Sequence, residues 1–169
     1  MGLLHQYDLI VEWTGAGDAG TASYTSYDRD HVVRVDGKAD LLGTSDAAFR
    51  GAPDRHTPEE LLVAALAQCH MLWFLHLAST AGVVVTGYTD HAQGTMRVES
   101  GGAGQFTDVV LRPRVVVRNA VTASGEAVDD ALLSSLHTAA HEHCFIARSV
   151  SFPVHVEPAA VRQEQDARA

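Results

Sequence analysis

Alternating apolar and polar residues predict β-structure at the start of the chain. Over residues 4–13 the alternation has the period that is typical of a half-buried strand. The Gly-rich segment 14–23 predicts a turn, and SYTSY and HVVRVDG after it predict short strands of a meander. Residues 37–56 carry Gly, Pro, Ser and Asp at short intervals, so we expect an irregular loop of a length that is often functional.

A long apolar helix is the strongest pattern in the sequence. Thr57-Pro58-Glu59-Glu60 has the form of a capping box, with Thr as N-cap, Pro at the first helical position and Glu at N3. The helix can continue to Gly82, a residue type that commonly follows a helix C-terminus. Its roughly 24 residues correspond to a length of about 36 Å. Because it is apolar on most sides, we expect it to lie in the middle of the fold.

The second half of the chain predicts two long strands, a helix and a last strand. The segments VVVTGYTDHAQGTMRVE and FTDVVLRPRVVVRN are typical of strands joined around SGGAGQ. In the second of these, Val109, Leu111, Val115 and Val117 are expected to face one side, with Arg112, Arg114 and Arg118 on the other. Residues 126–143 have the apolar spacing of a helix, and residues 149–157 predict a strand that Pro153 confines to an edge or a bulge.

Strands and helices are segregated along the chain rather than alternating, which predicts an α+β fold with mainly antiparallel sheet. The length of 169 residues is enough for one domain with a substantial core. We therefore expect a single domain over residues 1–158, followed by a flexible C-terminal tail over residues 159–169.

Composition and charge exclude several classes of protein. A formal charge of -9 and a pI near 5.4 argue against nucleic-acid binding, which needs a basic surface. The N-terminal segment has no basic region followed by an apolar one, and His and Gln interrupt the longest apolar stretch. We expect a cytoplasmic protein with no membrane partner. In that compartment the two cysteines are reduced bystanders, metal ligands or redox-active thiols.

Cys69 lies within the apolar helix, in AALAQCHMLWFLHLAS. Taken alone, it is typical of a small buried apolar residue. The alanines at positions 64, 65 and 67, however, leave a shallow face on which another long helix can approach. The other predicted helix is shorter, so the partner could be the same helix of a second copy. His70 follows Cys69 but points about 100° away around the helix, so we expect no direct contact between them.

Cys144 follows the second predicted helix, on a stripe that it shares with His137 and His141. One interpretation is a solvated helix face near the C-terminal end of the dipole. Another is zinc coordination by His137, His141, Cys144 and Cys69, which are suitable ligand types without a recognised spacing.

Two motifs together carry a resemblance to a known family. TPEELLVAALAQCH, with Cys69 ten residues after Glu59, and HEHCFIARSV about 75 residues later resemble the OsmC/Ohr family of osmotically inducible and organic hydroperoxide resistance proteins. The resemblance covers roughly residues 4 to 158 and indicates a divergent OsmC-like branch. It implies an OsmC-like fold, with antiparallel sheets around a long central helix, in an intertwined homodimer. It also implies a thiol-dependent peroxidase that reduces organic hydroperoxides without metal or cofactor.

The resemblance assigns roles to four residues. Cys69 would be the peroxidatic thiol, Cys144 the resolving thiol, and Glu59 the acidic partner of the active-site arginine. Arg50 is the first candidate for that arginine, although Ala48 occupies the slot where OsmC-type members have it; Arg29 and Arg55 are the reserves. A thiolate attacks the peroxide, a second thiol resolves the sulfenic acid, and an external dithiol, for example of the lipoyl type, reduces the disulfide.

Helix geometry adds a hypothesis about the site. On one continuous helix Glu59 and Cys69 would be about 15 Å apart along the axis and roughly 80° apart around it. A shared site would therefore use Glu59 of one subunit and Cys69 of the other. The alternative function is a non-catalytic OsmC-like protein that binds a small apolar ligand or a Cys/His-coordinated metal at the dimer interface. Trp73 and Phe74 either line an apolar substrate pocket or pack in the core.

Overall fold

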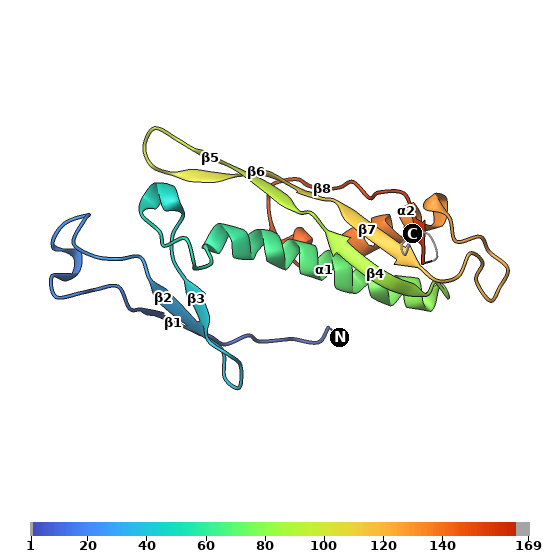
Figure 1. Ribbon diagram of the computed structural model, residues 1–169, viewed down its shortest axis with the longest axis horizontal. Coiled ribbons are helices and arrows are strands. Elements are labelled where there is room, and N and C mark those ends of the chain that lie inside the picture. The colour runs from blue at the N-terminus through green and yellow to red at the C-terminus, as the bar shows by residue number, and fades with distance from the viewer. Residues whose placement is uncertain (1, 165–169) are drawn as a thin grey trace. The chain divides into compact units, whose positions relative to one another are not determined.

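The computed structural model describes residues 2–164, which divide between Leu62 and Val63 into two compact units (Figure 1). The first unit contains an antiparallel sheet of three strands, β1 (Ile10–Trp13), β2 (His31–Arg34) and β3 (Leu41–Gly43), in the order β1-β2-β3. Two single-turn 3₁₀ helices, η1 (Gly20–Ala22) and η2 (Ala47–Phe49), interrupt its loops.

The first unit corrects three expectations from the sequence. The first strand is limited to residues 10–13 rather than 4–13, and SYTSY forms turns rather than a strand. In that turn Ser26 Oγ donates to the carbonyls of Gly20 and Ser23 at 2.7 and 2.9 Å. Such local side-chain bonds compete with a sheet ladder. Conversely, part of the expected loop forms β3, where a Cβ on Gly43 would lie only 2.2 Å from His31 Nε2, so the imidazole packs directly against the glycine.

The long helix α1 (Pro58–Thr80) confirms the strongest prediction from the sequence. The backbone N–H of Thr57 donates to Glu60 Oε2 at 2.9 Å, and the N–H of Glu60 donates to Thr57 Oγ1 at 3.2 Å, so the capping box is formed. The helix ends before Gly82, whose φ of 74° is the left-handed conformation that favours glycine.

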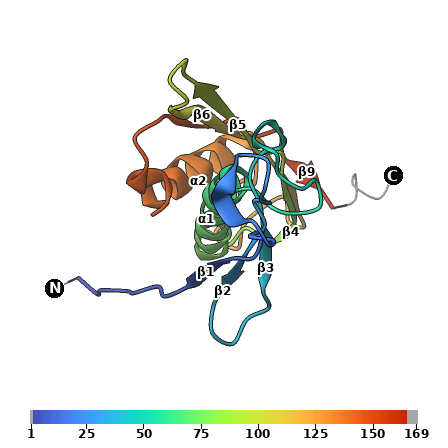
Figure 2. The same ribbon diagram turned by 90° about the vertical axis from the view of Figure 1, so that its left-hand side faces the viewer.

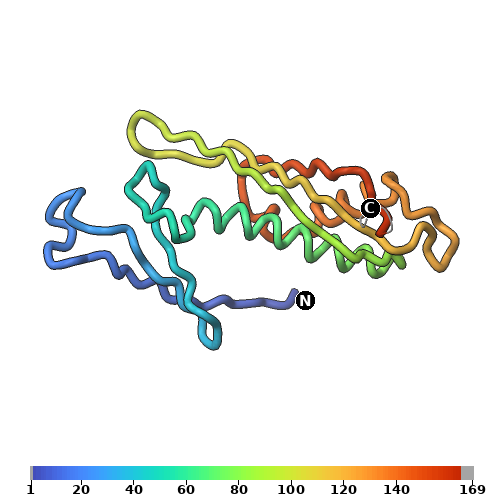
Figure 3. Tube along the Cα trace, viewed as in Figure 1, coloured from blue at the N-terminus to red at the C-terminus, as the bar shows by residue number. Residues whose placement is uncertain are grey.

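The second unit is built on a long antiparallel ribbon, traced by the yellow-green hairpin in Figure 3. Each expected long strand is divided in two, giving β4 (Val85–Asp90), β5 (Gln93–Val98), β6 (Gly104–Leu111) and β7 (Pro113–Val117). The break is stabilised by Asp90 Oδ1, which accepts the backbone N–H of Arg112 at 2.7 Å. Two short strands, β8 (Val154–Val156) and β9 (Arg162–Gln163), add in parallel to give the orders β5-β6-β8 and β4-β7-β9.

The C-terminal elements match the predictions in type but not in every boundary. Helix α2 (Asp130–His143) begins four residues later than predicted, because Asp129 is its N-cap and accepts from the backbone N–H of Leu132 at 3.0 Å. A 3₁₀ turn, η3 (Ala147–Ser149), follows it. Pro153 precedes the edge strand β8, as expected. The expected tail contains β9, and residues 165–169 lie outside the described residues.

Two apolar clusters cover α1 in the second unit. The first packs its C-terminal half, through Phe74 and Ala78, against β7 and α2. The second packs Leu66 against Val109 and Leu111 of β6. Within the described residues, α1 is the one helix that by length and composition could cross a membrane. Its part in both clusters identifies it as a core helix. The single domain over residues 1–158 stays a prediction.

Candidate functional site

The two cysteines meet in the second unit, although 75 positions separate them in the sequence. Cys69 lies in the middle of α1 and is half-buried, whereas Cys144 is the C-cap of α2 and only 1% exposed. Both thiols are free, and they lie close enough to interact with each other. The backbone N–H of Ala147, in η3, also donates to Cys144 Sγ at 3.4 Å. The arrangement brings together the two residues for which the sequence predicted redox roles.

The surroundings of Cys144 hold it in the thiol form. Burial, and then the interaction with Cys69, raises its pKa to about 11. At neutral pH Cys144 is therefore protonated and is a poor first nucleophile, since the thiolate is the reactive species.

An aromatic cluster is formed by residues that are close to the two cysteines along the chain. The ring of Trp73 lies one helical turn beyond Cys69, and its centroid is 5.0 Å from that of His143 and 5.5 Å from that of Phe145. Phe145 is 66% exposed, so this cluster offers an apolar surface to solvent next to Cys144. Phe74, in contrast, is fully buried in the first apolar cluster, which settles its alternatives in favour of core packing.

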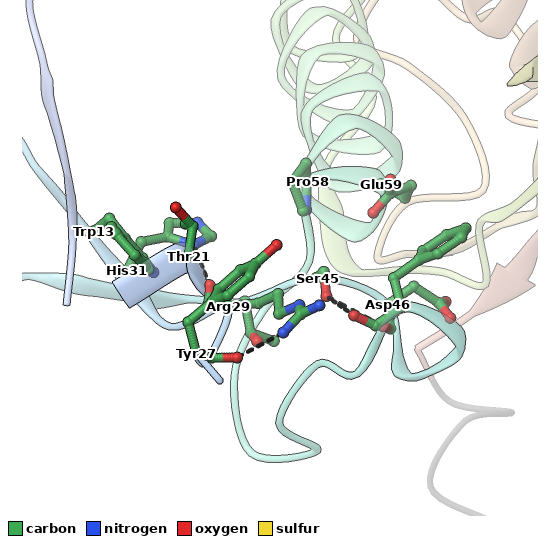
Figure 4. Close-up of a pocket in the computed structure, with 11 residues that line it drawn as sticks. Trp13, Thr21, Tyr27, Arg29, His31, Ser45, Asp46, Pro58 and Glu59 are labelled. Atoms are coloured by element: carbon green, nitrogen blue, oxygen red, sulfur yellow. Dashed lines mark hydrogen bonds between the residues drawn. The ribbon is translucent and has the colours of Figure 1, made fainter. Parts of the chain in front are cut away.

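A cavity of about 450 Å³ in the first unit contains Arg29 and Glu59 (Figure 4). Its lining is mostly apolar and includes Trp13, Tyr27 and Phe49. Figure 4 shows Glu59 on the first turn of α1 and Arg29 on the loop before β2. A cation and a carboxylate from separate segments therefore line the same cavity.

The loop holds the guanidinium of Arg29 firmly. Its Nη1 donates to the carbonyl of Tyr27 at 2.6 Å and its Nη2 to the carbonyl of Tyr24 at 2.9 Å. The guanidinium carbon also lies 4.2 Å from the centroid of the Tyr27 ring and 4.3 Å from that of Tyr24, a cation–π arrangement. Glu59 Oε2 is buried and has no hydrogen-bond partner among the described residues.

The other candidate arginines are placed differently. Arg50 is exposed at the C-cap of η2, with a φ of 71°, and does not line the cavity. Arg55 forms an ion pair with Asp30 at 3.0 Å. Of the three, Arg29 is the one that shares the cavity with Glu59. The role predicted for Arg50 stays a prediction.

A buried pair of histidines was missed at the sequence level. His70 of α1 and His137 of α2 are 0% and 3% exposed, and their Nε2 and Nδ1 atoms are 3.0 Å apart. The expectation that His137 lies on a solvated helix face is wrong, because its ring stacks on Phe74 with centroids 4.1 Å apart. A signal was present: Leu66, His70, Phe74 and Ala78 form the buried stripe of α1 at four-residue spacing.

Burial keeps both histidines neutral. It lowers the pKa of His70 to about 4, with a smaller contribution from His141, and it lowers that of His137 to about 3, with a smaller contribution from His70. Between residues 2 and 164, no three or more His, Cys, Asp or Glu side chains are grouped so that they could hold a metal ion.

Known proteins share both sequence and fold with this chain. Residues 51–159 match the family described as OsmC-like protein. An OsmC-like protein of unknown function from Vibrio cholerae is 33% identical, with a TM-score of 0.80, over 92% of this chain and 100% of that one.

Two more distant structures share the fold. An organic hydroperoxide resistance protein from Elizabethkingia anophelis has 17% identity and a TM-score of 0.63 over 97% of this chain and all of its own. One from Legionella pneumophila has 18% identity and a TM-score of 0.62 over 94% and 99% of the two chains. No curated protein matches the sequence. The family match over residues 51–159 and the 33% identity to an OsmC-like protein show that this chain belongs to the OsmC/Ohr family.

Proposed function

We propose that the protein is a cysteine-based peroxidase that reduces organic hydroperoxides, with Cys69 as the peroxidatic and Cys144 as the resolving residue. The observation that carries the proposal is the contact between two free thiols, one half-buried on α1 and one buried and protonated at the end of α2. Membership of the OsmC/Ohr family supports a peroxidase-type role, and two structures of the same fold are named organic hydroperoxide resistance proteins.

The reaction runs in three steps. The Cys69 thiolate forms a bond to one peroxide oxygen as the O–O bond breaks, and the other oxygen takes a proton and leaves as the alcohol. The Cys144 thiol then attacks the sulfenic sulfur, and its proton leaves with the hydroxyl group as water. An external dithiol, for which a lipoyl-type compound is a candidate, reduces the Cys69–Cys144 disulfide by exchange and is itself oxidised.

The raised pKa of Cys144 supports this order of roles. A protonated, buried thiol does not compete for the peroxide, yet it lies against the sulfur that becomes sulfenic acid. The exposed ring of Phe145 beside it suits the apolar group of a bulky organic hydroperoxide.

Arg29, rather than Arg50, is the cation that we assign to the site. It is already immobilised by two carbonyl groups and two tyrosine rings, and it shares a cavity with the unpartnered carboxylate oxygen of Glu59. A fixed guanidinium next to a thiolate stabilises the charged form of the thiol.

A homodimer would complete the site. Because α1 is uninterrupted, the ten residues from Glu59 to Cys69 correspond to about 15 Å of helix rise, so the Glu59 carboxylate of one copy is assigned to the Cys69 of another. Strand β1 supports a dimer, because all four of its residues are exposed although three are apolar or aromatic, namely Ile10, Val11 and Trp13. We assign the dimer to the cytoplasm.

A second candidate function rests on the cavity of the first unit. Its mostly apolar lining and volume of about 450 Å³ suit a small apolar ligand that is bound without turnover. In that case neither thiol would react with hydroperoxide.

Steady-state consumption of cumene hydroperoxide in the presence of a dithiol tests the proposal. The wild type should turn over, and Cys69→Ser should lose all activity above the background rate. Exposed His155 lies outside the proposed site, and His155→Gln is the matched control that should keep full activity. Full activity of Cys69→Ser would refute the mechanism.

A further inference from the structure

Helices α1 and α2 lie side by side and touch at two polar points (Figure 2). One is the contact between the thiols of Cys69 and Cys144, and the other is the hydrogen bond between His70 and His137. His70 is the next residue after Cys69. His137 precedes Cys144 by two turns of α2, about 10 Å along the helix.

Filling this space with two histidines costs more free energy than filling it with apolar side chains. Both side chains are removed from water, and His70 Nδ1 is buried without a hydrogen-bond partner among the described residues. Two apolar side chains of similar volume would leave no unpaired polar atom. Packing alone therefore does not account for two imidazoles at this position.

A hydrogen bond between two buried rings restricts the helices in a way that apolar packing does not. Apolar surfaces tolerate sliding and repacking, whereas the Nε2–Nδ1 contact of 3.0 Å is kept only at one register of α1 against α2. Buried polar pairs are used elsewhere to fix the register of packed helices. The stacking of His137 on Phe74 holds its ring plane in place.

We infer that His70 and His137 are positioning residues for the disulfide step, because their hydrogen bond sets the register that brings Cys144 to Cys69. This inference rests on the proposed function only in that the disulfide is part of the catalytic cycle. The pair touches no reacting atom. Its effect is on how often the two sulfurs are within bonding distance, which is the effective concentration of one thiol toward the other.

Two pairs of variants separate positioning from ordinary core packing. His70→Leu with His137→Leu fills the space but removes the hydrogen bond. His70→Gln with His137→Asn keeps it, since a Gln amide reaches the place of Nε2 and an Asn amide that of Nδ1. His91→Leu, at an exposed position directly after β4, removes a histidine away from the α1–α2 contact and serves as control.

The readout is the equilibrium between the dithiol and disulfide forms in mixtures of reduced and oxidised dithiothreitol, without hydroperoxide. Oxidised dithiothreitol accepts the two hydrogens of Cys69 and Cys144 as their S–S bond forms. We expect the Leu pair to shift this equilibrium about tenfold toward the dithiol while its stability in urea is unchanged or higher. The Gln/Asn pair and His91→Leu should stay within about threefold of the wild type.

A wild-type equilibrium for the Leu pair, or an equally large shift for the Gln/Asn pair, would overturn the inference. If the Leu pair does not fold, His70→Met and His70→Gln give the same comparison at one position, with the shift expected for Met alone. Peroxidase activity is measured separately, so a wild type that does not consume hydroperoxide would refute the proposed function and leave this test intact.

Discussion

The thiol of Cys144, at the end of α2, lies within interaction distance of the thiol of Cys69 in the middle of α1. The two sulfurs differ in environment, because Cys144 is almost fully buried and Cys69 is half-buried. In the proposed reaction the more accessible thiol of Cys69 therefore reacts with the peroxide. The buried thiol of Cys144 reacts with the sulfenic acid that forms on Cys69.

Removing the resolving thiol should expose Cys69 to further oxidation. In Cys144→Ser no thiol can condense with the sulfenic acid, so repeated doses of hydroperoxide should convert Cys69 to sulfinic and sulfonic acid. Intact-mass spectrometry would detect the added oxygens, and the wild type treated in parallel should show the disulfide instead. A Cys144→Ser protein whose Cys69 stays unmodified would contradict the assignment.

Loss of Arg29 should lower peroxidase activity far more than loss of Arg50. Arg29→Met removes the guanidinium that lines the cavity with Glu59, and we expect kcat/KM for cumene hydroperoxide to fall by about 100-fold, the scale of losing one electrostatic stabiliser. Arg50→Met, at an exposed position outside the cavity, should stay within about threefold of the wild type, in keeping with an ordinary surface substitution. A larger loss of activity in Arg50→Met than in Arg29→Met would instead identify Arg50 as the active-site cation.

Mixing two inactive variants tests whether the site is shared between subunits. In a heterodimer of Arg29→Met and Cys69→Ser, one shared site would contain both an intact Arg29 and an intact Cys69. Co-refolding equal amounts should therefore recover up to about one quarter of the wild-type activity, because half of the dimers are mixed and each has one working site. No recovery, with heterodimers verified by a tag, would place both residues in the same subunit.

Acid should destabilise the fold through the buried histidines. Burial lowers the pKa of His70 to about 4 and of His137 to about 3, so the unfolded chain, with ordinary values near 6.5, binds more protons at lower pH. Their contribution to stability is present in full above pH 6.5. As the pH falls below 6.5, the free energy of unfolding decreases by about 1.4 kcal/mol per pH unit for each histidine. For each residue the decrease ends at its pKa in the folded protein, which is about 4 for His70 and about 3 for His137.

Urea unfolding at several pH values measures this dependence. The His70→Gln/His137→Asn protein cannot take up those protons, so its free energy of unfolding should fall less steeply over the same range. Identical slopes for the two proteins would mean that other groups cause the acid sensitivity.

The sequence predicted features that depend on neighbouring residues. The capping box at Thr57 and Glu60 and the glycine after α1 are local, and both are formed as predicted. The inward face of β6 and β7 followed from alternation, and Val109 and Val117 are fully buried. The two cysteines required the family resemblance, since their contact spans 75 positions.

Features that depend on tertiary contact were beyond sequence reasoning. The hydrogen bond between His70 and His137 joins residues 67 positions apart, and although each residue lies on the buried stripe of its helix, that spacing does not show that the two rings meet. Arg29 could not be favoured over Arg50 before the loop that folds it between two tyrosine rings was known. Strand β3 forms within a segment rich in turn residues by pairing with β2, with Gly43 opposite His31, a contact that local sequence does not show.

The most direct test of the central claim is peptide mapping of the wild type after one equivalent of cumene hydroperoxide. The account predicts a single new species that has lost two hydrogens, with a disulfide between the peptides of Cys69 and Cys144 that a dithiol reverses. Unreacted thiols after that dose, or oxidation of both cysteines without a bond between them, would contradict it.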